Sequence, residues 1–457
     1  MILWFSLKLD KHHKEVSMIN ARTIKKIYGN SLVGNTPYSD IMLVRRKDES
    51  KPIGLTDYKS TTDMAVARKR QRAASYYNLV SRDRSVTVSD SAEMADTNLS
   101  LVLHGTNDLR LEERPIPESG PEGIFRFSLS EVQISIRSVG LCGSDVSYWQ
   151  KGRIGSLVVT KHMVLGHEPS GVVTKLGSRV NNLMVGDRVA VEPNRPCGTC
   201  YYCKRGRYNI CADLHYLATP PQDGCITRYF CHPARFVYWL PDNLSFDEGA
   251  LAQPLALGFY GCERGGLKVG HYLLVTGAGP MGMSTVLAAK ASGACKICVT
   301  DIIESRLDFI RKIGADVTVL APEDEDPEVT AKRIVELMEK EPDVSIECSG
   351  SESGINTAVH STRPTGTVVQ VGIGRISTQI PLTMGTLREL NIVGSSRFAN
   401  NYETVLEAIS IGRVNVKQLV THRFPLEESL KAYTATLNRE GVKVIVDCSR
   451  QENGKST

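Results

Sequence analysis

The stretch Tyr272-Leu-Leu-Val-Thr-Gly-Ala-Gly-Pro-Met-Gly282 decides the fold of the second half of the chain. Its first five residues form a mainly apolar run that ends at a glycine, which predicts a buried strand. The next six match the pattern G-x-G-x-x-G, and the small residues that follow are typical of a helix. A glycine turn between strand and helix lets the backbone approach a pyrophosphate, which binds at the unpaired N–H groups of the helix. The stretch therefore predicts a dinucleotide site.

Strands and helices alternate from this stretch to about residue 394. The further strands that we expect are 297–300, 344–347, 367–371 and 392–393. Alternation of this kind indicates a doubly wound parallel sheet, the Rossmann fold, over residues 255–394. A glycine-rich turn that binds no ligand is the alternative for the motif itself.

The residues around the glycine turn determine which nucleotide would bind. The motif residues that would contact it are Gly277, Gly279, Met281 and Gly282. Asp301 ends the next expected strand, where a carboxylate binds the ribose hydroxyls and repels a 2′-phosphate. NAD is therefore favoured over NADP. Arg306 suits either adenine stacking or a phosphate, so NADP stays open.

Short strands precede the Rossmann part of the chain. Polar and apolar residues alternate over 99–103, 132–137, 171–176 and 187–192. Closely spaced short strands predict a partly closed antiparallel barrel. After residue 394 we expect a helix near 402–411 and a closing strand over 443–447. Residues 98–254 and 395–457 would then form one domain.

Four cysteines cluster in this barrel part. Their spacing, C-x2-C-x2-C-x7-C, is made by Cys197, Cys200, Cys203 and Cys211. Four thiolates so close together fit a closed structural zinc site. An iron–sulfur cluster is the alternative, because it also takes four thiolates.

A second group of metal-ligand side chains surrounds the stretch Val164-Leu-Gly-His-Glu-Pro169. His167 and Glu168 place an imidazole beside a carboxylate, and Cys142 lies upstream in Leu-Cys-Gly-Ser-Asp145. Thiolate, imidazole and carboxylate are the ligand types that zinc prefers. A catalytic zinc takes only about three of them from the protein. These residues therefore predict a catalytic zinc.

Composition restricts the class of protein. The chain has 457 residues, of which 41% are hydrophobic and 23% charged, as in globular proteins of two or three domains. No apolar run reaches about 18 residues, so we expect no membrane span. The 12 cysteines are clustered rather than spread as a disulfide scaffold. They indicate reduced thiols and a cytoplasmic location.

The net charge of +5 is unevenly placed. Lys and Arg outnumber Asp and Glu in residues 1–97, whereas the rest of the chain is close to neutral. The polar composition of residues 1–97 predicts a largely disordered basic extension. Its run 67–72 is either a solvated basic segment or a nuclear-import or polyanion-binding patch. The near-neutral remainder gives no basis for nucleic-acid binding.

From Leu99 to about residue 449 the chain resembles the zinc-containing medium-chain dehydrogenases, and among them the polyol (sorbitol) dehydrogenases. The resemblance is carried by Leu-Cys142-Gly-Ser-Asp-Val-Ser-Tyr-Trp149, Gly-His167-Glu168, Leu-Ala-Thr-Pro-Pro221, Gly-Ala-Gly-Pro280 and Val-Thr-His-Arg-Phe-Pro425. It implies an α/β protein with a barrel-like (GroES-like) catalytic domain, completed by the C-terminal segment, and a Rossmann domain. It also implies a homo-oligomer, either a tetramer or a dimer.

The resemblance implies an activity as well: oxidation of a secondary alcohol of a small-molecule polyol to the ketose, by hydride transfer to NAD. Cys142, His167 and Glu168 would hold the zinc, which serves as a Lewis acid. Ser144 would relay the proton, while Tyr148 and Arg397 would contact the substrate. The cofactor contacts near the nicotinamide would be Val371, Gly372, Ile373, Ser395, Ser396 and Arg397.

Some residues depart from the polyol dehydrogenase pattern. Gln253 stands where those proteins have a glutamate beside the zinc, so the zinc would be more electrophilic here. Ser147 replaces a common His, Phe398 replaces a common Tyr of the substrate pocket, and an insertion occurs around residues 123–130. Two alternatives therefore stay open. One is a zinc alcohol dehydrogenase with a shifted substrate, and the other is a zinc- and NAD-binding homologue that has lost turnover.

Overall fold

A computed structural model describes residues 14–20, 40–46, 97–119 and 126–450. The chain divides into two compact units, Met1–Glu93 and Met94–Thr457. In the first unit, β1 (Lys14–Asn20) pairs antiparallel with β2 (Asp40–Arg46). The prediction of a disordered extension did not include this pair of strands. The rest of that extension, with the basic run 67–72, lies outside the described residues.

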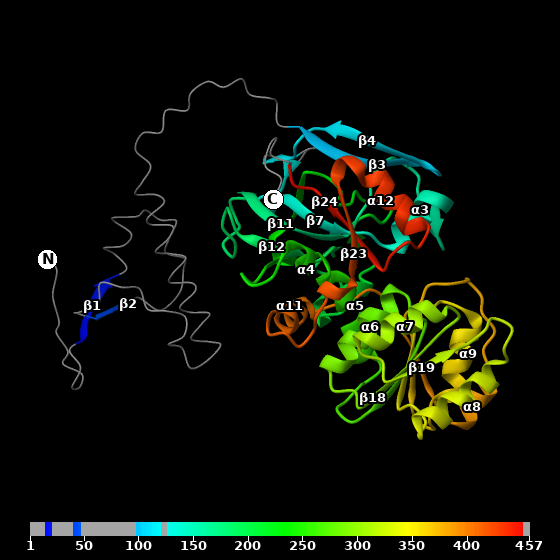
Figure 1. Cartoon of the computed structure of the whole chain (residues 1–457). Coiled ribbons are helices and arrows are strands. Elements are labelled where there is room, and N and C mark those ends of the chain that lie inside the picture. Colours follow the sequence, from blue (N-terminus) through cyan, green and yellow to red (C-terminus); the bar gives the residue numbers. More distant parts are fainter. Residues whose placement is uncertain (1–13, 21–39, 47–96, 120–125, 451–457) are drawn as a thin grey trace. The chain divides into compact units, whose positions relative to one another are not determined.

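The second unit contains a six-stranded parallel sheet in the order β19-β18-β17-β20-β21-β22. Figure 1 labels β18 and β19 of this sheet. Its strands are β17 (Tyr272–Thr276), β18 (Lys296–Asp301), β19 (Val317–Leu320), β20 (Val344–Glu347), β21 (Thr367–Gln370) and β22 (Asn391–Gly394). The helices between them are α6 (Pro280–Ala291), α7 (Glu304–Ile313), α8 (Pro327–Met338), α9 (Glu352–Ser361) and α10 (Leu382–Leu387). The predicted Rossmann sheet is therefore confirmed. Its strand order reverses at β17, where such sheets bind nucleotides.

Close backbone packing explains two glycines of the turn between β17 and α6. Gly277 has a φ of 98°, in the left-handed region that favours glycine. A Cβ atom on Gly282 would lie 1.9 Å from the carbonyl oxygen of Gly277. Neither position accepts a side chain without moving the turn. Pro280 begins α6, where the missing N–H of proline costs the helix no hydrogen bond.

The rest of the second unit is built on a seven-stranded sheet in the order β16-β12-β11-β7-β24-β23, with β15 also paired to β7. Its strands are β7 (Glu131–Gly140), β11 (Glu168–Leu176), β12 (Arg188–Val191), β15 (Tyr229–Pro233), β16 (Val237–Trp239), β23 (Val420–Pro425) and β24 (Lys443–Asp447). A three-stranded sheet consists of β3 (Asn98–Gly105), β4 (Asp108–Arg114) and β10 (Met163–Val164). The strands that the sequence predicted for this part are all present.

One strand pair differs from the predicted antiparallel barrel, because β23 and β24 run parallel. Helix α12 (Ser429–Leu437) lies between them in the chain, and such a crossover is what a parallel pair requires. β24 in turn pairs antiparallel with β7. This pairing brings the C-terminal strand next to the strand that leads to Cys142.

Short elements complete the second unit. They are β5 (Glu118–Ser119), β6 (Arg126–Phe127), β8 (Arg153–Ile154), β9 (Leu157–Val158), β13 (Asn194–Arg195), β14 (His215–Tyr216), α3 (Gly143–Lys151) and α4 (Phe246–Ala250). Residues 120–125, part of the expected insertion, lie outside the described residues. In the part of the chain that is described, no helix is long and apolar enough to cross a membrane.

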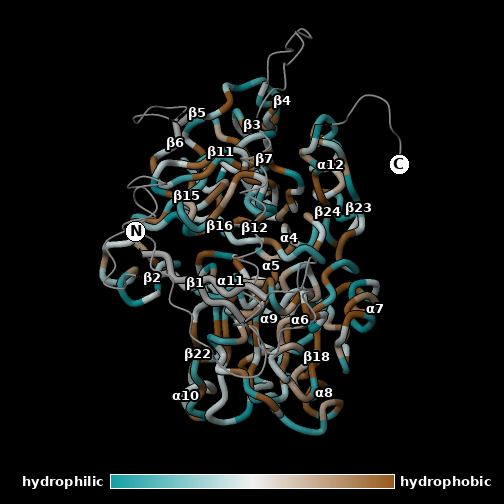
Figure 2. The backbone as a smooth tube through the Cα atoms, turned by 90° about the vertical axis from the view of Figure 1, so that its left-hand side faces the viewer, coloured by the Kyte–Doolittle hydropathy of each residue, from teal (hydrophilic) through white to brown (hydrophobic). Residues whose placement is uncertain are grey.

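Helix α5 (Ala252–Arg264) joins the two parts of the second unit. It shares one hydrophobic core with the parallel sheet and with α11 (Tyr402–Ser410). Figures 1 and 2 show α5 between the two sheets, and hydrophobic segments concentrate in the strands on both sides. The boundary predicted at residues 254 and 255 falls within this helix. The division into domains therefore stays a prediction.

Candidate active site

Cys142, His167 and Glu168 come together from two elements. Cys142 directly precedes α3, His167 directly precedes β11, and Glu168 is the first residue of β11. Because β11 pairs with β7, Glu168 lies opposite Gly140, near the end of the strand that leads to Cys142. One ligand atom from each residue lies within 4.8 Å of the other two. This triad of residues, which offers sulfur, nitrogen and oxygen as donors, fits a zinc ion.

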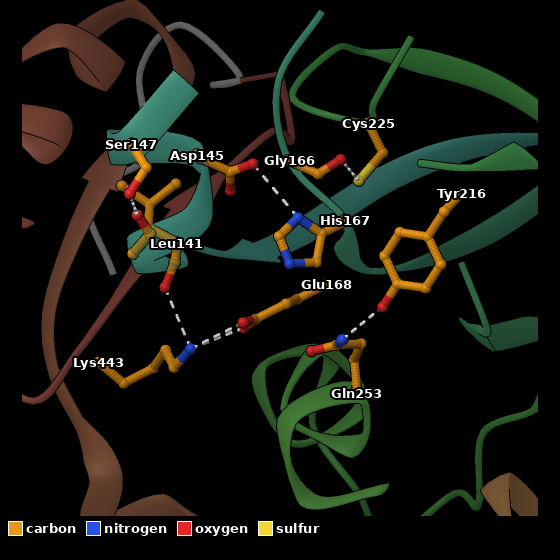
Figure 3. Close-up of polar contacts among 11 residues, drawn as sticks. Leu141, Asp145, Ser147, Gly166, His167, Glu168, Tyr216, Cys225, Gln253 and Lys443 are labelled. Atoms are coloured by element: carbon orange, nitrogen blue, oxygen red, sulfur yellow. Dashed lines mark hydrogen bonds and ion pairs between the residues drawn. The ribbon is translucent and has the colours of Figure 1, made fainter. Parts of the chain in front are cut away.

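Asp145 orients His167, a role that was not among the sequence predictions. Its Oδ1 lies 3.2 Å from Nδ1 of His167 (Figure 3), and its side chain is fully buried. Burial by itself would lower the pKa of His167, but the charge and hydrogen bond of Asp145 raise it. A carboxylate on the second ring nitrogen is the usual support of a metal-bound histidine. Its place three residues after Cys142 was the available signal.

Lys443 supports Glu168 in a similar way, and it too was missed. Its Nζ donates to both carboxylate oxygens at 2.9 Å and to the carbonyl oxygen of Leu141 at 3.1 Å. Figure 3 shows Lys443 reaching the Glu168 carboxylate from the side opposite Gln253. The signal was a charged residue directly before three apolar residues of a strand, where a buried lysine needs partners.

Gln253, Tyr216 and Arg397 form a second group beside the triad. Gln253, buried on α5, donates through Nε2 to the Tyr216 hydroxyl at 2.7 Å. The guanidinium carbon of Arg397 lies 4.5 Å from the centroid of the Tyr216 ring. That ring lies 5.8 Å from the ring of His167. The sequence predicts roles for Gln253 and Arg397 but gives no sign of Tyr216, which connects them to the triad.

Helix α3 carries the other predicted catalytic residues. Ser144 is half-buried in its first turn, and Tyr148 is buried one turn later. Burial raises the pKa of Tyr148, although a hydrogen bond with Thr219 lowers it in part. Ser147 donates to the carbonyl oxygen of Gly143 at 3.0 Å, so it satisfies the helix backbone. The structure thus brings Tyr148 close to the charge of Arg397, while the roles of Ser144 and Tyr148 stay predictions.

Phe398 occupies a different place from the one expected. It is fully buried and stacks on Tyr402, with the ring centroids 5.8 Å apart. Its side chain belongs to the hydrophobic core around α5 and α11. It therefore does not line an open substrate pocket, and the change from tyrosine bears on core packing.

The four clustered cysteines converge as the spacing predicted. The sulfur of Cys197 lies 3.9 Å from that of Cys203 and 3.5 Å from that of Cys211. Cys200 and Cys211 are 3.8 Å apart at sulfur. A tetrahedral zinc with bonds of about 2.3 Å needs sulfur–sulfur edges of roughly 3.8 Å. Residues 197–211, called the cysteine lobe from here on, therefore fit a structural zinc without rearrangement.

Asp301 ties the glycine turn to the end of β18. Its Oδ2 accepts from the backbone N–H of Ala278 at 2.7 Å, and its Oδ1 from that of Ile303 at 2.9 Å. Each oxygen keeps a lone pair for a ribose hydroxyl. Nη1 of Arg306 lies 3.9 Å from Oδ2 of Asp301. The other predicted nucleotide contacts lie at this turn or in the first turn of α6: Gly277, Gly279, Met281 and Gly282.

A cavity of about 410 Å³ joins predicted cofactor residues to the cysteine lobe. The residues from the cofactor set are Val371, Gly372, Ile373, Ser395 and Ser396. The lobe contributes Arg207, Asn209 and Ile210. Segments that are far apart in the sequence therefore share one hollow, which the sequence did not predict.

Comparison with known proteins agrees with the observed fold. The family described as "Alcohol dehydrogenase GroES-like domain" matches residues 128–242, and "Zinc-binding dehydrogenase" matches residues 280–410. The sorbitol dehydrogenase of Bos taurus is 47% identical over 351 residues, which are 77% of this chain and 96% of that protein. The sorbitol dehydrogenase of Homo sapiens is 46% identical over 358 residues, covering 78% of this chain and 98% of that one.

A solved structure supports the same assignment. It is that of an oxidoreductase/dehydrogenase of unknown specificity from Escherichia coli, with a TM-score of 0.71 and 33% identity. The match covers 77% of this chain and 99% of that one. The fold, the two metal-ligand clusters and these matches lead to one conclusion: the chain belongs to the zinc-containing medium-chain dehydrogenase family, with sorbitol dehydrogenases among its relatives.

Proposed function

We propose that the chain is a zinc- and NAD-dependent dehydrogenase that oxidises a secondary alcohol of a sugar polyol, such as sorbitol or xylitol, to the ketose. One observation carries the proposal. Ligand atoms of Cys142, His167 and Glu168 lie within 4.8 Å of one another, in a chain 47% identical to a sorbitol dehydrogenase. Zinc held by these residues would supply Lewis-acid chemistry that lowers the pKa of the substrate hydroxyl.

The chain's own residues would orient the polyol. Arg397 offers several N–H donors to substrate hydroxyls, and its stacking on Tyr216 limits its freedom. Burial raises the pKa of Tyr148, so its hydroxyl stays protonated and can donate to the substrate. Ser144, in the first turn of α3, would pass the released proton toward solvent. The amide of Gln253 would hold the Tyr216 hydroxyl in place.

NAD would lie across the carboxyl end of the parallel sheet. Its ribose would bind Asp301, whose oxygens keep free lone pairs. The carboxylate disfavours a 2′-phosphate, which supports NAD over NADP. The nicotinamide end would lie against the residues of the shared cavity: Val371, Gly372, Ile373, Ser395 and Ser396, with Arg397 next in the chain.

The proposal also includes assembly of the chain into a homo-oligomer. β22 is an edge strand of the parallel sheet. Large apolar side chains are exposed on β22 and on the segment before it, namely Ile373, Ile376, Leu382, Leu387 and Ile392. An edge strand with exposed apolar side chains favours pairing with a second copy.

The location and the domain division are also proposed. All 12 cysteines lie in the described part of the chain and are unpaired, which suits the cytoplasm. Residues 98–254 with 395–457 would form the zinc-containing domain, and residues 255–394 the NAD domain. No nucleic acid or membrane is part of the proposed function.

A zinc dehydrogenase acting on another alcohol is the second candidate. Gln253 favours it, because it places a neutral amide where the polyol dehydrogenases that the chain resembles have a carboxylate. A change of charge beside the metal alters which alcohols ionise well there.

The test is NAD reduction by sorbitol and xylitol, compared with ethanol and 2,3-butanediol, using protein whose zinc has been counted. We expect oxidation of the polyols and loss of activity in Cys142→Ser. Cys295→Ser, which changes an exposed cysteine outside both clusters, is the matched control. Activity with the simple alcohols alone would favour the second candidate. Bound zinc and NAD without any oxidation would refute both enzyme proposals.

A further inference from the structure

The segment 396–400, which carries Arg397, is held by the cysteine lobe. The backbone N–H of Asn400 donates to the Tyr208 hydroxyl at 2.8 Å. Nδ2 of Asn400 donates to the carbonyl oxygen of Gly206 at 2.7 Å. Nδ2 of Asn209 donates to the carbonyl oxygen of Ser396 at 2.8 Å. The lobe therefore contacts the segment on both sides of Arg397.

The backbone of the segment requires such support. Arg397 has a φ of 51° and Asn400 a φ of 61°, both in the left-handed region. That region is unfavourable for a long side chain such as arginine, and such a conformation persists where neighbouring contacts impose it. Between these residues, the carbonyl oxygen of Phe398 accepts a hydrogen bond from Nδ2 of Asn194 at 3.2 Å. Contacts from outside thus fix the whole segment.

The metal cluster is placed to fix the lobe in turn. Gly206, Tyr208 and Asn209 all lie between Cys203 and Cys211 in the sequence. Both cysteines belong to the group of four whose sulfur atoms converge. A zinc ion bound there would anchor both ends of residues 203–211, which contact the segment 396–400.

We infer that the cysteine lobe positions Arg397, and that the affinity for the polyol and for the cofactor depends on the contacts of Tyr208, Asn209 and Asn400. These three are positioning residues, since they act through the segment 396–400. The inference rests on the proposed function for the polyol. The part of the inference that concerns cofactor affinity rests on the cavity that Asn209 lines together with Ser395 and Ser396.

The test uses the zinc-loaded full chain and two variants that keep the fold. Tyr208→Phe removes the hydroxyl that accepts from Asn400, together with its hydrogen bond with the buried Glu192, and keeps the ring, which packs on Phe236. Asn400→Gly removes the donor to Gly206, and glycine keeps the left-handed backbone without strain. Each has a matched control. Tyr201→Phe removes an exposed hydroxyl in the same lobe, and Asn107→Gly makes the same change at an exposed residue with a φ of 62°.

Three readouts are measured for each protein: the dissociation constant of NADH, the KM for sorbitol together with kcat, and hydrogen exchange of the peptide containing residues 395–400. We expect each variant to raise the dissociation constant and KM about threefold, and the double variant about tenfold, which is the scale of one or two lost hydrogen bonds. Hydrogen exchange of the peptide should become faster in the variants, while their zinc content should stay the same. All three readouts should be unchanged in the control variants.

An NADH dissociation constant and peptide exchange in the double variant that match the controls would overturn the inference. If the wild-type protein oxidises no polyol, the proposed function fails. NADH binding and hydrogen exchange then still decide the positioning role, because neither needs turnover.

Discussion

Nζ of Lys443 lies 2.9 Å from both carboxylate oxygens of Glu168, and the two side chains are only 5% and 1% exposed. The residues are 275 positions apart in the chain. They meet because β24, which starts at Lys443, pairs with β7, and β7 pairs with β11, which starts at Glu168. Two buried charges of opposite sign stabilise each other only while both are present. Lys443 therefore fixes the orientation of a predicted zinc ligand.

Replacing Lys443 by methionine should destabilise the protein strongly. The change leaves Glu168 buried without its cation, and breaking a buried pair costs about 3 to 5 kcal/mol. The measurement is urea unfolding of the zinc-loaded protein, with Lys443→Arg as the variant that keeps the charge. Lys431→Met is the control, because its pair with Glu428 is solvent-exposed and should contribute little. A loss no larger than that of the control would contradict the structural role of Lys443.

Gln253→Glu should move the acid limb of the kcat/KM profile to higher pH. The new carboxylate adds negative charge next to Tyr216 and near the thiolate and carboxylate of the triad. Negative charge favours the protonated form of a group that must lose a proton, so its pKa rises. The pH profiles of the two proteins are compared with that of Gln379→Glu, which adds the same charge at an exposed position. An acid limb that stays in place would disprove the proposed effect of residue 253.

Asp343 should stabilise the NAD-binding part in a pH-dependent manner. Its carboxylate accepts from the backbone N–H of Tyr272 at 2.9 Å and from Nε of Arg363 at 2.7 Å. Burial opposes its ionisation, but these contacts and Lys340 lower its pKa to about 2. Since the folded pKa is depressed, the stabilisation is present above about pH 4 and is lost as the pH falls toward 2.

Asp343→Asn should therefore lower the free energy of unfolding by about 1 kcal/mol at pH 7, a modest value because water screens the partly exposed Arg363. The difference from wild type should shrink between about pH 4 and pH 2. Urea unfolding across this range tests it, with the exposed Asp324→Asn as the control. A difference that stays constant with pH would show that the charge of Asp343 is not the cause.

Cys200→Ser should release one zinc per chain and leave the other bound. The four sulfur atoms form one cluster, and the triad of Cys142, His167 and Glu168 forms another. A closed structural zinc site is held by about four protein ligands, so the loss of one of them weakens zinc binding greatly. Zinc is counted by elemental analysis after dialysis, beside Cys295→Ser, which should keep both ions. Retention of two zinc ions in Cys200→Ser would show that the lobe tolerates loss of that ligand.

The sequence predicts those parts of the site whose geometry depends on residues close together in the chain. The spacing of Cys197, Cys200, Cys203 and Cys211 brought four thiols together, since a short loop closes them without help from the rest of the fold. The glycine turn after β17 was equally readable, because the φ of Gly277 and the close approach at Gly282 are properties of a few consecutive residues. Asp301 followed from the length of one strand–helix unit.

The sequence by itself determined the alternation of strands and helices, the cysteine lobe and the identity of the predicted zinc ligands. Only the tertiary structure decided which distant groups support them: Lys443 beside Glu168, Tyr216 between Gln253 and Arg397, and Asn209 and Asn400 between the lobe and the segment 396–400. The parallel pairing of β23 and β24 belongs with these. The physical reason is that a periodic pattern records how a residue meets its neighbours in the chain, whereas a partner some two hundred residues away is brought close only by the pairing and packing of the sheets.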